Sequence, residues 1–209
     1  MKRWSWVALS VLCAMYAAEF RDVRASGTAQ AANPNAATIA DFKKRVDAYM
    51  AQHKQAVQRV GSLDPTKSPK EIAARETALG QALRALRKDA KQGNLLTPAV
   101  GKLFRAIIRS EFAHRSSLAL KNRDDAQDEL PAFTPMVNQV YPTTYPIATF
   151  PPGVLRELPE LPKPLEYRFV RQYLILRDSE ANLIVDVLPD AAPPMNALSS
   201  RGRAASGAK

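Results

Sequence analysis

The sequence predicts an α+β protein in which a three-helix N-terminal bundle is followed by a proline-rich extended strap and a small antiparallel β-meander. Apolar residues recur at helical spacing between residues 38 and 112. Nine prolines then fall within residues 131–164, and three short runs of β-branched and aromatic residues follow them. With 46% apolar residues, the chain has enough hydrophobic side chains for a core.

The N-terminal segment has the pattern of a secretory signal peptide. Lys2 and Arg3 precede an apolar run from Trp4 to Ala18, and Ala29-Gln30-Ala31 provides the small-x-small pattern of a cleavage site. As a helix, such a run reaches roughly 22 Å, which is less than the roughly 30 Å hydrocarbon core of a bilayer. We therefore expect residues 1–31 to be removed during export to the periplasm or outside, leaving no stable transmembrane span.

Two features leave alternatives to this processing. Charged residues separate the apolar run from the cleavage site, so an uncleaved anchor is one alternative. Cys13 suggests a lipoprotein, although Leu12 occupies the position where a small residue is needed. Because Cys13 is the only cysteine, a mature chain beginning near Ala32 has no disulfide, thiolate metal site or cysteine nucleophile.

The basic charge is concentrated in the predicted helical region. Residues 1–31 carry a net charge of +2, residues 32–129 carry +7 and residues 130–209 carry +1. An exported protein does not meet genomic DNA, so we expect no specific nucleic acid as a partner. The predicted partner is an anionic envelope component, such as a phosphate, lipid headgroup or acidic polysaccharide, or another envelope protein. A basic face that only keeps the protein soluble is the alternative.

Helix start and stop signals define the three predicted helices within residues 32–129. The first begins near Thr38 and ends before Gly61. The second begins at Ser68-Pro69, where the serine hydroxyl is expected to cap a free amide, and ends before Gly93; the third begins at Thr97-Pro98. Their apolar stripes are Ile39, Phe42, Val46, Tyr49, Met50, His53, Val57 and Val60; Ile72, Leu79, Leu83 and Leu86; and Val100, Leu103, Phe104, Ile107, Ile108 and Phe112.

A cluster of basic residues falls near the end of the second predicted helix. Its members are spaced three or four residues apart: Arg84, Arg87, Lys88 and Lys91. Such spacing gathers positive charge on one part of a helix surface, which makes these residues candidates for anion binding. Cations near a helix C-terminus also stabilise the helix through its dipole, which explains them without a ligand.

The segment from 130 to 193 is expected to combine the strap and the meander. Proline disfavours helix, so we expect mostly extended chain, with an edge strand over Thr134–Tyr141 and one helical turn over Pro152–Leu158. Its apolar residues favour packing on the bundle; the alternative is an unpacked polyproline segment that binds a partner protein. The strands of the meander are expected at 167–170, 173–176 and 183–188, and residues 194–209 read as a disordered tail.

Several strings in the chain resemble a family of uncharacterised exported bacterial proteins. The C-terminal strings are LEYRFV at 165–170, LILRD at 174–178 and ANLIVD at 181–186, and the resemblance extends over roughly residues 41–193. It implies export but no activity, because no function is assigned to that family. The first hairpin turn departs from expectation, because Arg171-Gln172 stands where Gly or Asn would accept a positive φ more easily.

Few residues in the sequence are candidates for chemistry. Asp178, Glu180 and Asp186 surround the second hairpin turn, where carboxylates are able to bind a hard cation or act as an acid and base pair. Turn carboxylates more often bond their own backbone. Of the two histidines, His53 lies on an apolar stripe, as a hydrogen-bonded core histidine would, and His114 lies near a helix end. No carboxylate is spaced along the chain to orient either imidazole as a metal ligand, so we expect no metal and no cofactor.

These observations favour an exported, non-enzymatic interaction domain whose molecular function the sequence does not define. A metal-dependent or acid/base hydrolase that uses Asp178, Glu180 and Asp186 is the first alternative. An accessory protein that assembles with itself is the second.

Overall fold

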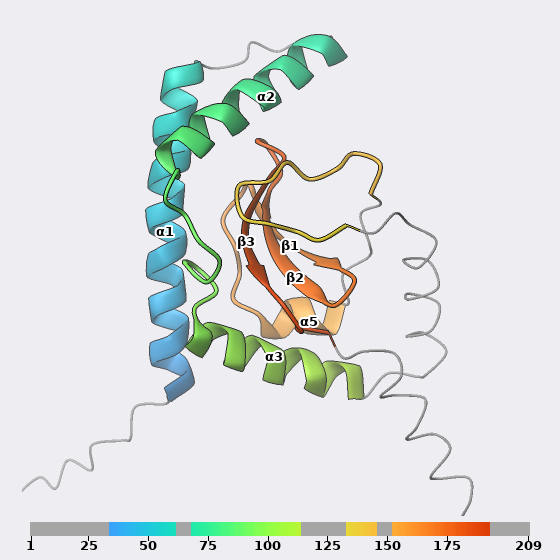
Figure 1. Ribbon diagram of the computed structural model, residues 1–209. Coiled ribbons are helices and arrows are strands. Elements are labelled where there is room, and N and C mark those ends of the chain that lie inside the picture. The colour runs from blue at the N-terminus through green and yellow to red at the C-terminus, as the bar shows by residue number, and fades with distance from the viewer. Residues whose placement is uncertain (1–33, 62–67, 114–132, 146–151, 193–209) are drawn as a thin grey trace, which may run out of the picture. The chain divides into compact units, whose positions relative to one another are not determined.

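Four helices and one three-stranded sheet make up the described structure. The computed structural model describes residues 34–61, 68–113, 133–145 and 152–192, which all belong to one compact unit (Figure 1). The predicted signal peptide, His114, the charged stretch at 116–129 and the tail at 194–209 lie outside these ranges. The elements are α1 (Pro34–Val60), α2 (Pro69–Leu86), α3 (Pro98–Ala113), α5 (Pro152–Glu157), β1 (Leu165–Val170), β2 (Tyr173–Asp178) and β3 (Leu183–Leu188).

The predicted helix ends are confirmed in part. Helix α1 begins four residues before Thr38 and ends at Val60, where Gly61 adopts a φ of 85°. Helix α2 begins after Ser68 as predicted, but the Ser68 side chain makes no capping hydrogen bond. The prediction that α2 continues almost to Gly93 is wrong. The helix ends at Leu86, because the Arg87 amide bonds to both the Leu83 and Arg84 carbonyls and Arg87 leaves helical dihedrals.

The three long helices share one hydrophobic core with one face of the sheet. In Figure 1, α2 and α3 contact different ends of α1, and the sheet lies between them. The buried helical residues follow the predicted stripes, although Ile72 of the α2 stripe is exposed at 47%. Core residues from the helices include Phe42, Val46, Tyr49, Leu79, Leu83, Val100, Phe104, Ile108 and Phe112, and those from the sheet include Tyr167, Phe169, Leu174, Leu176 and Val185. The α+β class is confirmed.

The predicted antiparallel meander is confirmed. The strand order is β1-β2-β3, and the register between β2 and β3 shifts between Leu176 and Arg177. Although Arg171 is a poor residue for a tight turn, it adopts a φ of 52° and the two-residue turn forms. Asn182 adopts a φ of 47° at the end of the second turn, a conformation that Asn tolerates better than most residues.

The other face of the sheet is covered by residues 133–145. Here Tyr141 and Tyr145 pack on the apolar sheet residues Val170, Ile175, Ile184 and Val187. The predicted strand over Thr134–Tyr141 is wrong, because Asn138 turns with a φ of 64° and only Val140 forms a bridge, to Leu183. This part of the strap packs on the sheet, not on the bundle as predicted, because the helical faces are already buried against the opposite sheet face.

Helix α5 confirms the predicted helical turn and packs against α3. Within the described ranges, no helix combines the length and the apolar character that crossing a membrane requires.

Candidate functional site

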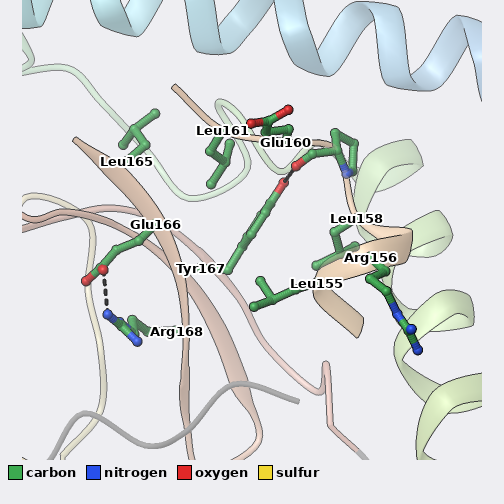
Figure 2. A pocket seen from close by; sticks show the side chains of 10 residues that line it. Leu155, Arg156, Leu158, Glu160, Leu161, Leu165, Glu166, Tyr167 and Arg168 are labelled. Carbon is green, nitrogen blue, oxygen red and sulfur yellow. Dashed lines mark hydrogen bonds and ion pairs between the residues drawn. The ribbon is translucent and has the colours of Figure 1, made fainter. Parts of the chain in front are cut away.

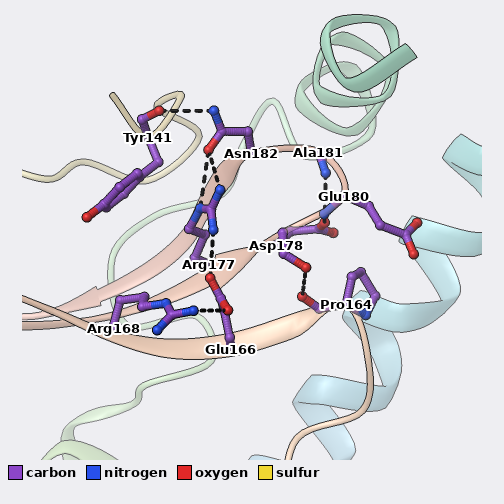
Figure 3. A network of polar contacts seen from close by, with 10 residues as sticks. Tyr141, Pro164, Glu166, Arg168, Arg177, Asp178, Glu180, Ala181 and Asn182 are labelled. Atoms are coloured by element: carbon purple, nitrogen blue, oxygen red, sulfur yellow. Dashed lines mark hydrogen bonds and ion pairs between the residues drawn. The ribbon is translucent and has the colours of Figure 1, made fainter. Parts of the chain in front are cut away.

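Asp178, at the end of β2, joins the sheet to helix α1. Its side chain is fully buried. Oδ2 accepts a hydrogen bond from the Tyr49 hydroxyl at 2.6 Å and lies 2.7 Å from Nδ1 of His53. Oδ1 accepts the backbone amides of Glu180 and Ala181 at 3.0 and 2.9 Å, in the turn shown in Figure 3. All four partners belong to this chain, so the carboxylate holds both the β2–β3 turn and helix α1 in place.

The charges of this cluster follow from its contacts. The hydrogen bond to Asp178 raises the pKa of His53 above its ordinary 6.5, and burial opposes that shift. Burial on its own would raise the pKa of Asp178, but hydrogen bonds from His53, Tyr49 and Ala181 hold it below the ordinary 3.8. Burial, followed by the charge of Asp178, raises the pKa of Tyr49. At neutral pH, Asp178 is therefore an anion and Tyr49 a neutral donor.

Asp186, in the middle of β3, holds the loop between α2 and α3. Its side chain is also fully buried. Oδ2 accepts the amides of Leu95 at 2.7 Å and Leu96 at 2.8 Å, and Oδ1 accepts those of Gly93 at 2.9 Å and Val187 at 2.7 Å. Four backbone donors therefore surround this one carboxylate. Hydrogen bonds to a charged acceptor are the stronger kind, so Asp186 ties the loop firmly to the sheet.

Arg87 is only 5% exposed and interacts electrostatically with both carboxylates. Its guanidinium donates to Oδ1 of Asn138 at 2.9 Å and to the Val185 carbonyl at 2.7 Å. It also lies 5.0 Å from the centre of the Tyr49 ring. The Asn138 side chain donates back to the Arg87 carbonyl at 2.8 Å, so Arg87 connects α1, the sheet and the strap. Burial lowers its pKa.

The predicted anion-binding cluster is therefore only partly a surface feature. Lys88 and Lys91 are exposed and Arg84 is half-buried, but Arg87 points into the protein. The prediction placed all four residues on one helical face. It fails for Arg87 because the helix ends at Leu86, so helical spacing no longer sets the direction of the side chains that follow.

The predicted carboxylate cluster does not converge on one cavity. Asp178 and Asp186 are each saturated by different internal donors, whereas Glu180 is 56% exposed at its side chain and lies 3.4 Å from Nε2 of His53. Within the described ranges, no group of three His, Cys, Asp or Glu side chains is placed to hold a metal ion. The prediction that His53 is a hydrogen-bonded core histidine is confirmed.

A second polar network connects the sheet to the strap (Figure 3). Glu166 accepts hydrogen bonds from Arg168 and, at 2.7 Å, from Arg177. Arg177 also donates to Oδ1 of Asn182 at 2.8 Å, and Asn182 donates to the Tyr141 carbonyl at 3.0 Å. Burial would raise the pKa of Glu166, but the two arginines lower it. This network ties the strap residue Tyr141 to the sheet and pairs the Glu166 carboxylate with two arginines.

The cavity shown in Figure 2 has a volume of about 640 Å³ and lies beside α5 and β1. Its walls are mainly apolar, from Leu155, Leu158 and Leu161, and the Tyr167 hydroxyl donates to the Pro159 carbonyl at 2.9 Å. The charged residues of the lining are Arg156, Glu160, Glu166 and Arg168, so its formal charges balance. Among the described residues that line this cavity, none is a nucleophile paired with a base.

Sequence reasoning missed two members of the buried cluster, Tyr49 as a donor to Asp178 and Arg87 as an internal cation. A signal for Tyr49 was present, since Tyr49 and His53 are four residues apart and therefore lie on one face of a helix. No comparable signal exists for Arg87.

Comparison with family models, with curated protein sequences and with solved structures gives no match to this chain.

Proposed function

We propose that this protein is an exported, non-enzymatic interaction domain that binds an anionic envelope component through its basic helical surface. In this proposal residues 1–31 are a cleaved signal peptide. The helices of residues 32–129 supply the basic surface, and residues 130–193 form the strap and meander that support these helices. The finished domain works in the periplasm or outside the cell.

One observation carries the non-enzymatic part. The two carboxylates best placed for chemistry, Asp178 and Asp186, are fully buried and each accepts four internal contacts. A general base or metal ligand must reach its substrate or ion, and these oxygens have no accessible lone pair to offer. No specific observation favours the alternative of a hydrolase.

The binding part rests on charge. Residues 32–129 carry a net charge of +7, and among the candidate cations Lys88 and Lys91 are exposed. A positive surface attracts phosphates, acidic polysaccharides and anionic lipid headgroups through long-range forces that salt screens. The proposal therefore predicts binding that weakens as the salt concentration rises.

Retention of the purified protein on heparin, on peptidoglycan and on vesicles containing phosphatidylglycerol, at low and at high salt, tests this proposal. A lysine near an anionic surface contributes about 1 kcal/mol, so Lys88→Glu with Lys91→Glu should weaken binding by at least about 30-fold. The matched control is Lys70→Glu with Lys102→Glu, two exposed lysines outside the candidate cluster that give the same change in net charge. Absence of salt-sensitive retention on all three materials would contradict the proposal, and equal effects of both pairs would contradict the assignment to Lys88 and Lys91.

Export has its own test. N-terminal sequencing of the protein recovered from the cell envelope or the medium should give a chain that begins near Ala32. Full-length protein confined to the cytosol would contradict the proposed location.

A further inference from the structure

The His53 imidazole lies between two carboxylates that differ in exposure. Its Nδ1 is 2.7 Å from the buried Asp178, and its Nε2 is 3.4 Å from the half-exposed Glu180. Asp178 is the last residue of β2, and Glu180 lies in the turn between β2 and β3. A single side chain of α1 therefore contacts both the end of a strand and the turn that follows it.

The two contacts respond differently to loss of a proton. Protonated His53 donates from both ring nitrogens, one towards each carboxylate. Neutral His53 keeps only one N–H, and the buried Asp178 anion at 2.7 Å retains it on Nδ1. Nε2 then presents a lone pair towards the Glu180 carboxylate, so an attraction becomes a repulsion while the Asp178 contact survives.

Glu180 is free to respond because its side chain is 56% exposed, so water is able to solvate its carboxylate once His53 no longer attracts it. It lines a cavity of about 490 Å³ with Ile72, Arg75 and Glu76 of α2. Nη1 of Arg75 is buried without a hydrogen-bond partner. Because Arg75 and Glu180 line the same cavity, this unsatisfied nitrogen offers the released carboxylate a second partner.

We propose that His53 and Glu180 form a proton-operated latch: protonated His53 holds the β2–β3 turn against α1, and neutral His53 releases Glu180 into the cavity beside α2. The latch is independent of the proposed anion binding, because it involves none of the lysines assigned to that surface. Its effect is local, since Asp178 remains bonded to His53 in both states.

The remaining charged groups around His53 do not reverse this behaviour. Tyr49, on the same helix, stays neutral because its pKa is raised. Arg87 acts on Asp178 and Tyr49 and keeps its charge at neutral pH, although its pKa is lowered. Arg75 and Glu76 of α2 line the same cavity as Glu180. Asp178 and Glu180 both raise the pKa of His53, which extends the protonated state above pH 6.5.

NMR titration of the protein tests the latch. Below the pKa of His53, its ring protons should show a nuclear Overhauser effect to the γ-methylene of Glu180, and this contact should disappear as the ring loses its proton. The Glu180 carboxyl carbon should show a second step in its chemical shift at the pKa of His53. That step should be absent in His53→Gln.

A second experiment compares the pKa of His53 in two variants. Glu180→Gln should lower the pKa of His53, because it removes one of the two carboxylates that favour the protonated ring. The matched control, Glu76→Gln, removes a carboxylate of the same cavity for which no contact with His53 is found, and should leave that pKa unchanged. A His53 pKa at or below 6.5, an Overhauser contact that persists after deprotonation, or equal effects of the two variants would overturn the proposal.

Discussion

The Asp186 carboxylate is a point at which one conservative substitution should strongly perturb the fold, because four backbone amides donate to it. Asp186→Asn preserves the size of the side chain but replaces one accepting oxygen with an NH₂ group that only donates. In one orientation of the amide, that group faces the amides of Gly93 and Val187, and in the other it faces those of Leu95 and Leu96. Either way, two N–H groups lose their acceptor; in the first orientation that of Val187 is buried and that of Gly93 partly buried, and in the second both are buried.

The expected loss in the free energy of unfolding follows from these two N–H groups without an acceptor. A buried donor without an acceptor costs about 1–3 kcal/mol, so Asp186→Asn should reduce the free energy of unfolding by about 4 kcal/mol. Since the stability of a domain is typically about 5–15 kcal/mol, the variant should keep about 1–11 kcal/mol and remain folded, with a clearly lower urea midpoint than the wild type.

Urea unfolding followed by circular dichroism measures this loss. Asp190→Asn is the matched control, because Asp190 is exposed and has a φ of 50°, which Asn accepts. The control should stay within about 0.5 kcal/mol of the wild type. If Asp186→Asn lost less than about 1 kcal/mol, the four amides would not depend on this carboxylate and the reasoning would be refuted.

Three further predictions concern the contacts of α1 and α2 with the β2–β3 turn. Tyr49→Phe removes the 2.6 Å hydrogen bond to the Asp178 anion and should lower the free energy of unfolding by about 1.5–3 kcal/mol; an unchanged urea midpoint would contradict it. Gly80→Ala should destabilise by about 1 kcal/mol although alanine favours helix, because its Cβ would lie 3.0 Å from the Ala181 carbonyl oxygen; a higher melting temperature would contradict it. Folding lowers the pKa of Asp178, so this carboxylate adds to the free energy of unfolding above its ordinary pKa of 3.8. That contribution is lost as the pH falls through the lower pKa that Asp178 has in the folded protein. The free energy of unfolding should therefore fall more steeply below pH 4 for the wild type than for Asp178→Asn, and parallel curves would count against the assignment.

Much of the fold follows from local rules in the sequence. Apolar residues at helical spacing predicted the buried faces of α1 and α3, and β-branched runs predicted all three strands. Such patterns succeed because they record which side of an element meets the core. Residues 134–141 show the limit of this approach. Their composition suits a strand, but the segment covers the sheet face beside Ile175 and turns at Asn138, and no local rule selects that arrangement.

The candidate site was harder to predict because its contacts span long distances in the chain. Asp178 meets Tyr49 across 129 residues, and Asp186 meets Leu95 across 91. Position in a turn suggested that Asp178 would bond its own backbone, and it does so with one oxygen. The partner of the other oxygen depends on the packing of α1 against the sheet, which spacing along the chain does not encode.

The central structural claim is that buried carboxylates hold the helices on the sheet and are not available for chemistry. Hydrogen exchange of the Gly93, Leu95 and Leu96 amides tests it most directly, because these loop groups have Asp186 as their acceptor. We predict that they exchange as slowly as the paired amides of β2 and β3, and that Asp186→Asn removes this protection. Exchange of all three at the rate of unprotected loop amides in the wild-type protein would contradict the claim.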